Sequence, residues 1–204
     1  MKRNRCGKAA IFTNRDIEKI RKAFTIPYHR CIFEIALYTG ERMGAICQLN
    51  VADVYADPVL RTPYNLITFA ASTRKKRPDG STETRQVPLH PDLKDFLKAY
   101  IPPLKGYLFP SNCNKNKTDI AFSKHITRRA IDKYWRGQFI KLNLDRKGFS
   151  THSCRRWLIT QLAHNGIDVK TIQQITGHKS INVLLEYIEA DEKRISNALG
   201  TIRT

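Results

Sequence analysis

The sequence lacks the features that mark membrane, secreted or disulfide-rich proteins. It has no run of 18 apolar residues, and no apolar signal core follows the basic N-terminus MKRNRCGK. No C-x-x-C pair suggests a zinc or redox centre, because the five cysteines are widely spaced at Cys6, Cys31, Cys47, Cys113 and Cys154. We therefore expect reduced thiols and a cytoplasmic location.

Acidic residues are also scarce. Against 36 Lys and Arg stand only 18 Asp and Glu, which gives a formal net charge of +18 over 204 residues. Such an excess indicates a polyanionic partner and favours nucleic acid as its class. Ribosomal and other RNA-binding proteins share this bias, so the charge leaves the chemistry open. The 41% of apolar residues suffice for a core, and the length favours one domain.

Apolar periodicity predicts a mainly α fold with a small antiparallel β-sheet (α+β). TNRDIEKIRKAF opens with a capping residue and spaces Ile17, Ile20 and Phe24 along one helix face. YNLITFAAST and ETRQVPLH, separated by the turn-forming RPDGS, read as the two strands of a hairpin. Further helices are expected in HRCIFEIALYTG, in RMGAICQL, and at residues 91–101, 119–135, 153–165, 168–176, 180–188 and 191–199.

The stretch THSCRRW, residues 151–157, places positive charge where a helix begins. A helix N-terminus carries roughly half a positive charge and disfavours Arg by about 0.3–1 kcal/mol. Arg155 and Arg156 lie there nevertheless, and Arg42 similarly follows the break at Thr39-Gly40. A bound anion would reverse the penalty, and His152, three residues before Arg155, could grip the same phosphate. For any one of these residues, solvent exposure or a carboxylate partner is the simpler alternative.

A second group of polar residues follows in ITGHKSINVLLEYIE. His178 comes one residue after Gly177, which ends a predicted helix. Tyr187 falls at the edge of the next helix's apolar stripe, so its ring can pack on the core while its hydroxyl faces a cleft. A lone tyrosine so placed is usually a packing residue.

Taken together, these segments resemble the catalytic domain of the tyrosine recombinases, the phage integrase family. TGERMGAICQLNVADV resembles the first arginine box, THSCRRW the H-x-x-R box, and TGHKSINVLLEY the G-H box with the nucleophilic tyrosine nine positions later. YLFPS resembles a segment ahead of the third basic cluster. We expect a basic N-terminal segment at 1–12, the catalytic domain at 13–190 and a C-terminal tail at 191–204.

The resemblance implies a site-specific recombinase in which Tyr187 attacks a DNA phosphodiester. The products would be a 3′-phosphotyrosyl bond and a free 5′-hydroxyl, formed without ATP, metal or cofactor. Arg42 and Arg155 would hold the non-bridging oxygens. His152 would manage the tyrosine proton, and His178 would donate a hydrogen bond to the phosphate.

The family also places a lysine on the hairpin, as general acid for the departing 5′-oxygen. Alternation along a strand through Ile67, Phe69, Ala71 and Thr73 would put Lys75 on the inward face, so we assign the role to Lys75. The other basic residues of the hairpin turn and of the boxes are assigned to DNA contacts: Arg74, Lys76, Arg77, Arg156 and Lys179.

The sequence departs from the family pattern in two ways. Ala45 stands where an acidic residue usually follows the first arginine by three positions, so support for Arg42 must come from elsewhere or be weaker. Only about a dozen residues precede the first predicted helix, whereas family members commonly carry a separate N-terminal DNA-clasping domain. A short relative and a truncated chain would look alike.

The implied partners are double-stranded DNA, further copies of the chain and accessory DNA-binding proteins, with no membrane. Copies would assemble up to a tetramer on paired sites, with the tail docking on a neighbour, in a nucleoid-associated protein. Two alternatives are a DNA-binding regulator of the same fold that does not cut, and an enzyme of the type IB topoisomerase class. The recombinase-like boxes argue against the topoisomerase. Five intact residues argue against the regulator: Arg42, His152, Arg155, His178 and Tyr187.

Overall fold

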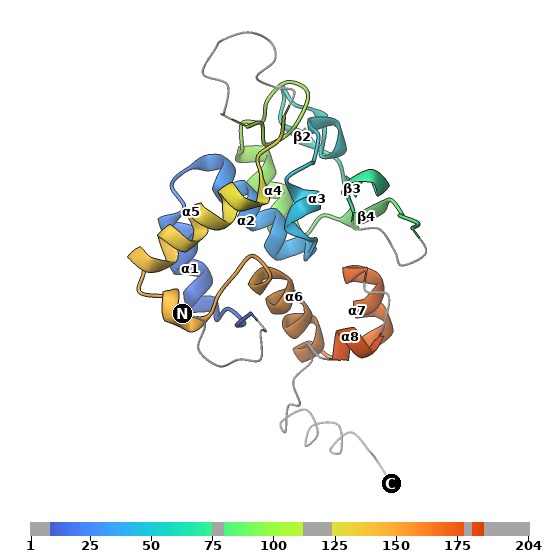
Figure 1. The fold of residues 1–204 in the computed structure, drawn as a ribbon. Coiled ribbons are helices and arrows are strands. Elements are labelled where there is room, and N and C mark those ends of the chain that lie inside the picture. Colours follow the sequence, from blue (N-terminus) through green and yellow to red (C-terminus); the bar gives the residue numbers. More distant parts are fainter. Residues whose placement is uncertain (1–8, 75–79, 112–123, 178–180, 186–204) are drawn as a thin grey trace.

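In the computed structural model, which describes residues 9–74, 80–111, 124–177 and 181–185, the chain folds into packed helices with two small antiparallel sheets at one side (Figure 1). The mainly α prediction is confirmed. The helices are α1 (Asn14–Ala23), α2 (Pro27–Thr39), α3 (Met43–Ile46), α4 (Pro91–Ala99), α5 (Arg128–Lys141), α6 (Ser153–His164), α7 (Val169–Thr176) and α8 (Ile181–Leu185). Short 3-10 turns cover Val51–Asp53, Ala71–Thr73 and Asp145–Lys147.

Helix α1 begins where the capping pattern predicts. The Thr13 hydroxyl accepts from the backbone N–H of Asp16 at 3.2 Å, and the Asp16 carboxylate accepts from the backbone N–H of Thr13 at 3.1 Å. This reciprocal capping box satisfies two N–H groups that a helix start leaves unpaired. Helix α2, buried along most of its length, ends at Gly40 in the left-handed conformation with φ of 58°.

The predicted hairpin is formed by β3 (Leu66–Phe69) and β4 (Arg85–Pro88), with Leu66 opposite Pro88 and Phe69 opposite Arg85. The first strand is shorter than predicted, because a 3-10 turn begins at Ala71 and the Thr73 hydroxyl donates to the Ala70 carbonyl at 2.8 Å. The alternation that selected Lys75 therefore does not run through Ala71. A second hairpin, β1 (Tyr55–Asp57) with β2 (Thr62–Pro63), was not predicted.

Helix α5 differs from the prediction of a helix over 119–135. It begins at Arg128, because Thr127 caps it by accepting from the N–H of Ala130 at 3.2 Å, and it continues to Lys141. Residues 112–123 lie outside the described residues, as do those of the predicted helix at 191–199.

Two apolar clusters hold the described helices together. The larger cluster surrounds α2 and includes Phe33 and Trp135. The smaller cluster joins α6, α7 and α8 through four buried residues, namely Ile159, Ala163, Ile172 and Leu184. These three helices lie together at the lower side of Figure 1. Among the described residues no helix is long and apolar enough to span a membrane, and Cys31, Cys47 and Cys154 are buried free thiols.

Candidate active site

Arg155, in the first turn of α6, is 5% exposed and points at the ends of two other helices. Its guanidinium donates to the carbonyl of Gly40, the residue that ends α2, at 2.6 Å. It also donates to the carbonyl of Thr176, the last residue of α7, at 2.8 Å. Helix C-termini carry about half a negative charge, which offsets the cost of a buried cation. The positive charge at the start of α6 therefore meets the negative ends of α2 and α7.

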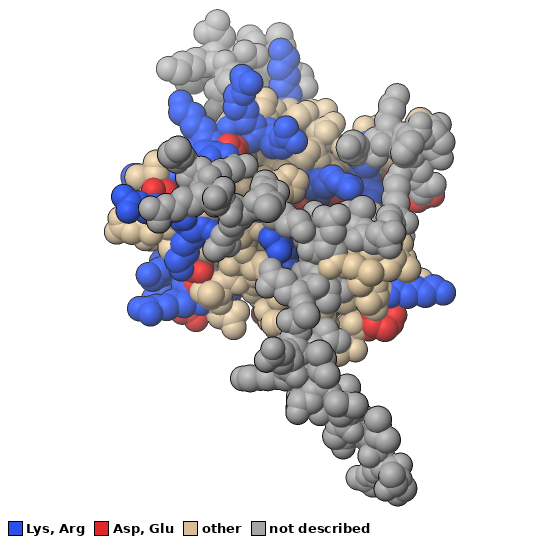
Figure 2. Space-filling model, turned by 60° about the horizontal axis from the view of Figure 1, so that its bottom comes forward, with Lys and Arg blue, Asp and Glu red and all other residues tan. Residues whose placement is uncertain are grey.

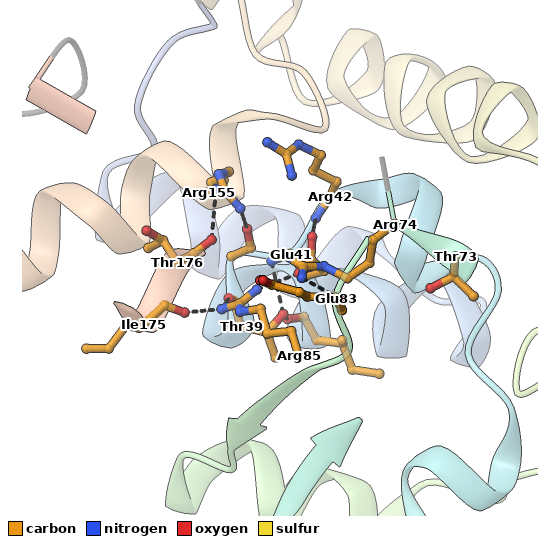
Figure 3. A network of polar contacts seen from close by, with 12 residues as sticks. Thr39, Glu41, Arg42, Thr73, Arg74, Glu83, Arg85, Arg155, Ile175 and Thr176 are labelled. Carbon is orange, nitrogen blue, oxygen red and sulfur yellow. Dashed lines mark hydrogen bonds and ion pairs between the residues drawn. The ribbon is translucent and has the colours of Figure 1, made fainter. Parts of the chain in front are cut away.

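Arg85 makes the same kind of bridge from strand β4. Its Nη2 donates to the Thr39 carbonyl at 3.0 Å and to the Ile175 carbonyl, so it also joins α2 to α7 (Figure 3). Its Nη1 lies 2.6 Å from a carboxylate oxygen of Glu41. Arg85 is not among the site residues predicted from the sequence. The alternation in RQVP could have indicated it, because Arg85 lies on the same buried strand face as Val87.

Glu41 supplies the carboxylate of this network and is 4% exposed. One of its oxygens accepts the backbone N–H of Arg42 at 2.7 Å. The other pairs with Arg85 and lies 3.5 Å from Nε of Arg74, an ion pair without hydrogen-bond geometry. Burial alone would raise the pKa of Glu41, but the charge of Arg85, the N–H of Arg42 and the charge of Arg74 leave that pKa lowered. Glu41 therefore stays ionised.

Position 45, where the family pattern would place a carboxylate, is apolar in this chain. Ala45 is 2% exposed and packs in the core. The backbone of Arg42 is held by the preceding residue, because the Glu41 carboxylate accepts the Arg42 N–H. The Arg42 side chain is exposed, and its guanidinium extends out of the network (Figure 3).

His152 is exposed at the start of α6, one turn before Arg155. Its backbone N–H donates to the Ser150 hydroxyl at 3.2 Å, while the Ser153 hydroxyl accepts from the Ser150 N–H at 3.0 Å. These two bonds fix the turn that precedes α6. The structure thus brings Arg42 and Arg155 to the end of α2 and sets His152 at the start of the helix that carries Arg155.

Two residues predicted to contact DNA have protein partners. Arg156 is 6% exposed and donates to the Ala9 carbonyl, so it holds the start of the described chain against α6. Arg74 donates to the Glu83 carbonyl at 2.8 Å, and its side chain is 13% exposed. The remaining predicted site residues lie outside the described residues: Lys75, Lys76, Arg77, His178, Lys179 and Tyr187.

The charge around this site is positive. Arg42, Arg74, Arg85 and Arg155 outnumber the single buried carboxylate of the network, Glu41 (Figure 3). Seen from the side of α6 to α8, Lys and Arg cover more of the described surface than Asp and Glu (Figure 2). Within the described residues, no group of three His, Cys, Asp or Glu could hold a metal ion.

The chain is similar to curated proteins named tyrosine recombinase XerD. It is 28% identical over 166 residues to that of Staphylococcus saprophyticus, covering 81% of this chain and 51% of the relative. It is 25% identical over 173 residues to that of Oceanobacillus iheyensis, covering 83% of this chain and 52% of the relative. The chain therefore spans about half the length of the curated relatives that it matches.

Solved structures share the fold. The crystal structure of XerA recombinase superposes with a TM-score of 0.70 at 20% identity, over 96% of this chain and 66% of that one. The Tn1549 transposon integrase in complex with a circular intermediate DNA gives a TM-score of 0.68 at 17% identity, over 96% and 66%. The sequence model described as the phage integrase family matches residues 11–194. Since that match covers most of the chain, the protein belongs to the phage integrase family.

Proposed function

We propose that the protein is a site-specific recombinase that breaks and rejoins DNA strands through Tyr187. The Tyr187 oxygen attacks the phosphorus of a phosphodiester, the bond from phosphorus to the 5′-oxygen breaks, and a 3′-phosphotyrosyl link forms. His152 receives the tyrosine proton, and Lys75 gives a proton to the departing 5′-oxygen. The phosphotyrosyl link keeps the energy of the broken bond, so a 5′-hydroxyl of another strand can reverse the attack.

The observation that carries this proposal is the meeting of Arg42 and Arg155 at the end of α2. Gly40 accepts from Arg155, and Arg42 follows only two residues later with an exposed guanidinium. Two arginines beside the same helix end suit a phosphate whose charge grows in the transition state. Removal of one such donor costs about 10²–10³ in rate. We assign the hydrogen bond from His178 to the same phosphate.

The proposed substrate is double-stranded DNA. The net charge of +18 favours a polyanion. A structural neighbour, XerH recombinase, is described as bound to its difH substrate in a pre-cleavage complex. Lys76 and Arg77 of the hairpin turn and Lys179 of the G-H box are proposed to contact the DNA backbone. Arg74 would instead act through Glu41.

We also propose self-association on DNA. Two copies on each of two sites would bring strands together for exchange, with residues 191–204 docking on a neighbouring copy and residues 13–190 forming the catalytic domain. Accessory DNA-binding proteins would assist pairing of the sites. A protein with these partners would work at the nucleoid.

A selection for covalent adducts tests the proposal and identifies the target sequence at the same time. The protein is incubated with a library of nicked duplexes of randomised sequence, in which the nick lets the 5′-hydroxyl fragment leave. Adducts that survive denaturation are isolated and sequenced. We expect a defined sequence from the native protein and no adduct from Tyr187→Phe, with DNA binding retained. An adduct on Tyr187→Phe would remove that residue from its role, and DNA binding without any adduct would identify a non-cutting regulator.

A further inference from the structure

We propose that Arg85 is a positioning residue of the recombinase: it holds the C-terminal end of α7 against that of α2, and so sets where the chain leaves α7 relative to Arg42 and Arg155. The inference rests on the proposed function, because it names a residue that prepares that site. Arg85 does not need to touch DNA in this role, and its 8% exposure agrees with an internal one.

The geometry is a double bridge between two helix ends (Figure 3). Arg155 reaches from α6 to the carbonyls of Gly40 and Thr176. Arg85 reaches from β4 to the carbonyls of Thr39 and Ile175, the residues immediately before those two. Each guanidinium therefore contacts one carbonyl of each helix end. A planar guanidinium holds its donors in a rigid fork, so it fixes both distance and orientation.

Glu41 extends the bridge to the first arginine box. Its carboxylate pairs with Arg85 at 2.6 Å through one oxygen and accepts the Arg42 N–H at 2.7 Å through the other. A shift of Arg85 is therefore transmitted to the backbone that carries the Arg42 side chain. Charge-assisted hydrogen bonds of this kind are shorter and stronger than neutral ones.

The end of α7 fits tightly against the side chains that hold it. Gly177 ends α7 with φ of 65°, a conformation that L-residues disfavour. A Cβ built there would lie 3.0 Å from Nη2 of Arg74 and 3.3 Å from Cδ of Arg85. The apolar residue that anchors α7, Ile172, belongs to the smaller cluster and not to the core around α2. Helix α7 packs on α6, which in turn packs on α2, and these polar contacts add direct links between the ends of α2 and α7.

The test uses Arg85→Met and Arg85→Lys in the full chain, on the nicked duplex that the native protein selects. We expect Arg85→Met to form adduct about 100-fold more slowly at saturating protein, because displacement of a site by about 1 Å costs that much, while its DNA affinity stays within about threefold. Arg85→Lys keeps a positive charge beside Glu41, so we expect its melting temperature to return from that of Arg85→Met to that of the native protein. Its rate remains at least about 10-fold low, because one ammonium cannot reproduce the fork.

Arg21 offers a matched control pair. It is bonded to the buried Glu34 through two nitrogens, at 3.0 and 2.8 Å, and joins α1 to α2. We expect Arg21→Met to lower the melting temperature as Arg85→Met does, without slowing adduct formation measured well below that temperature. A structural role alone would make the two arginines behave alike.

Hydrogen exchange at α7 separates failure of this inference from failure of the proposed function. Backbone amides of α7 should exchange faster in Arg85→Met and Arg85→Lys than in the native protein, and at the native rate in Arg21→Met. Unchanged exchange, or a native adduct rate for Arg85→Lys, would overturn the positioning role. If Arg85→Met does not fold, Arg85→Lys decides by itself. If the native protein forms no adduct, the proposed reaction fails while exchange still reports whether Arg85 holds α7.

Discussion

Arg42 and Arg155 share one proposed role, but the structure predicts that their removal has different effects on folding. Arg155→Ala deletes two hydrogen bonds, to the carbonyls of Gly40 and Thr176, from a side chain that is 5% exposed. Loss of a hydrogen bond from a charged donor costs about 1.5–3 kcal/mol, so we expect a loss of about 3–5 kcal/mol in the free energy of unfolding. Arg42→Ala removes an exposed side chain and should change that free energy by less than about 0.5 kcal/mol.

Urea unfolding followed by circular dichroism measures this difference, and adduct formation on the selected duplex measures the chemistry. Both variants should form the adduct about 10²–10³-fold more slowly than the native protein. Only Arg155→Ala should also unfold at a lower urea concentration. The loss for Arg155→Ala is a large part of the roughly 5–15 kcal/mol by which folded proteins are stable, so its rate must be measured where the variant is folded. Equal midpoints for the two variants would refute the idea that Arg155 holds the ends of α2 and α7.

Three further perturbations test other parts of the structure. Burial lowers the pKa of His29 to about 4 from its ordinary 6.5, so the unfolded chain binds the proton first. The free energy of unfolding should then fall by about 3 kcal/mol as the pH drops through that window, and His29→Phe should flatten this slope. Thr13→Ala removes the cap of α1 and should cost about 1 kcal/mol in urea unfolding, and no loss would contradict the capping box. The logarithm of DNA affinity should fall linearly with the logarithm of salt, by about 0.9 per neutralised phosphate, whereas a flat response would exclude phosphate contacts as the source of affinity.

Local signals in the sequence were sufficient for most elements. The cap at Thr13 located α1, and a glycine in the left-handed conformation ended both α2 and α7 as predicted. These features depend on a few adjacent residues, so they can be read without the rest of the chain. The predicted start of α5 was wrong, because the helical pattern begins before Thr127 whereas the helix is capped at Thr127.

The partners of the site residues could not be predicted. Alternation along β4 could have indicated that Arg85 shares the buried face with Val87, but not that Arg85 would meet carbonyls of α2 and α7. The same limit applies to Glu41, whose place next to Arg42 in the sequence gave no sign that it would be the buried partner of Arg85. Contacts between residues far apart in sequence depend on the packing of whole helices, which no short pattern contains.

The hydrogen bond from Arg155 to Gly40 has a consequence for how the protein is made. The two residues are 115 positions apart in the chain. At a typical synthesis rate of about 5–20 residues per second, roughly 6 to 23 seconds pass between the addition of Gly40 and that of Arg155. A nascent chain on the ribosome therefore displays Arg42 well before its partner cation exists. The two arginines meet only after Arg155 has left the ribosome, so no shorter nascent polypeptide contains the pair.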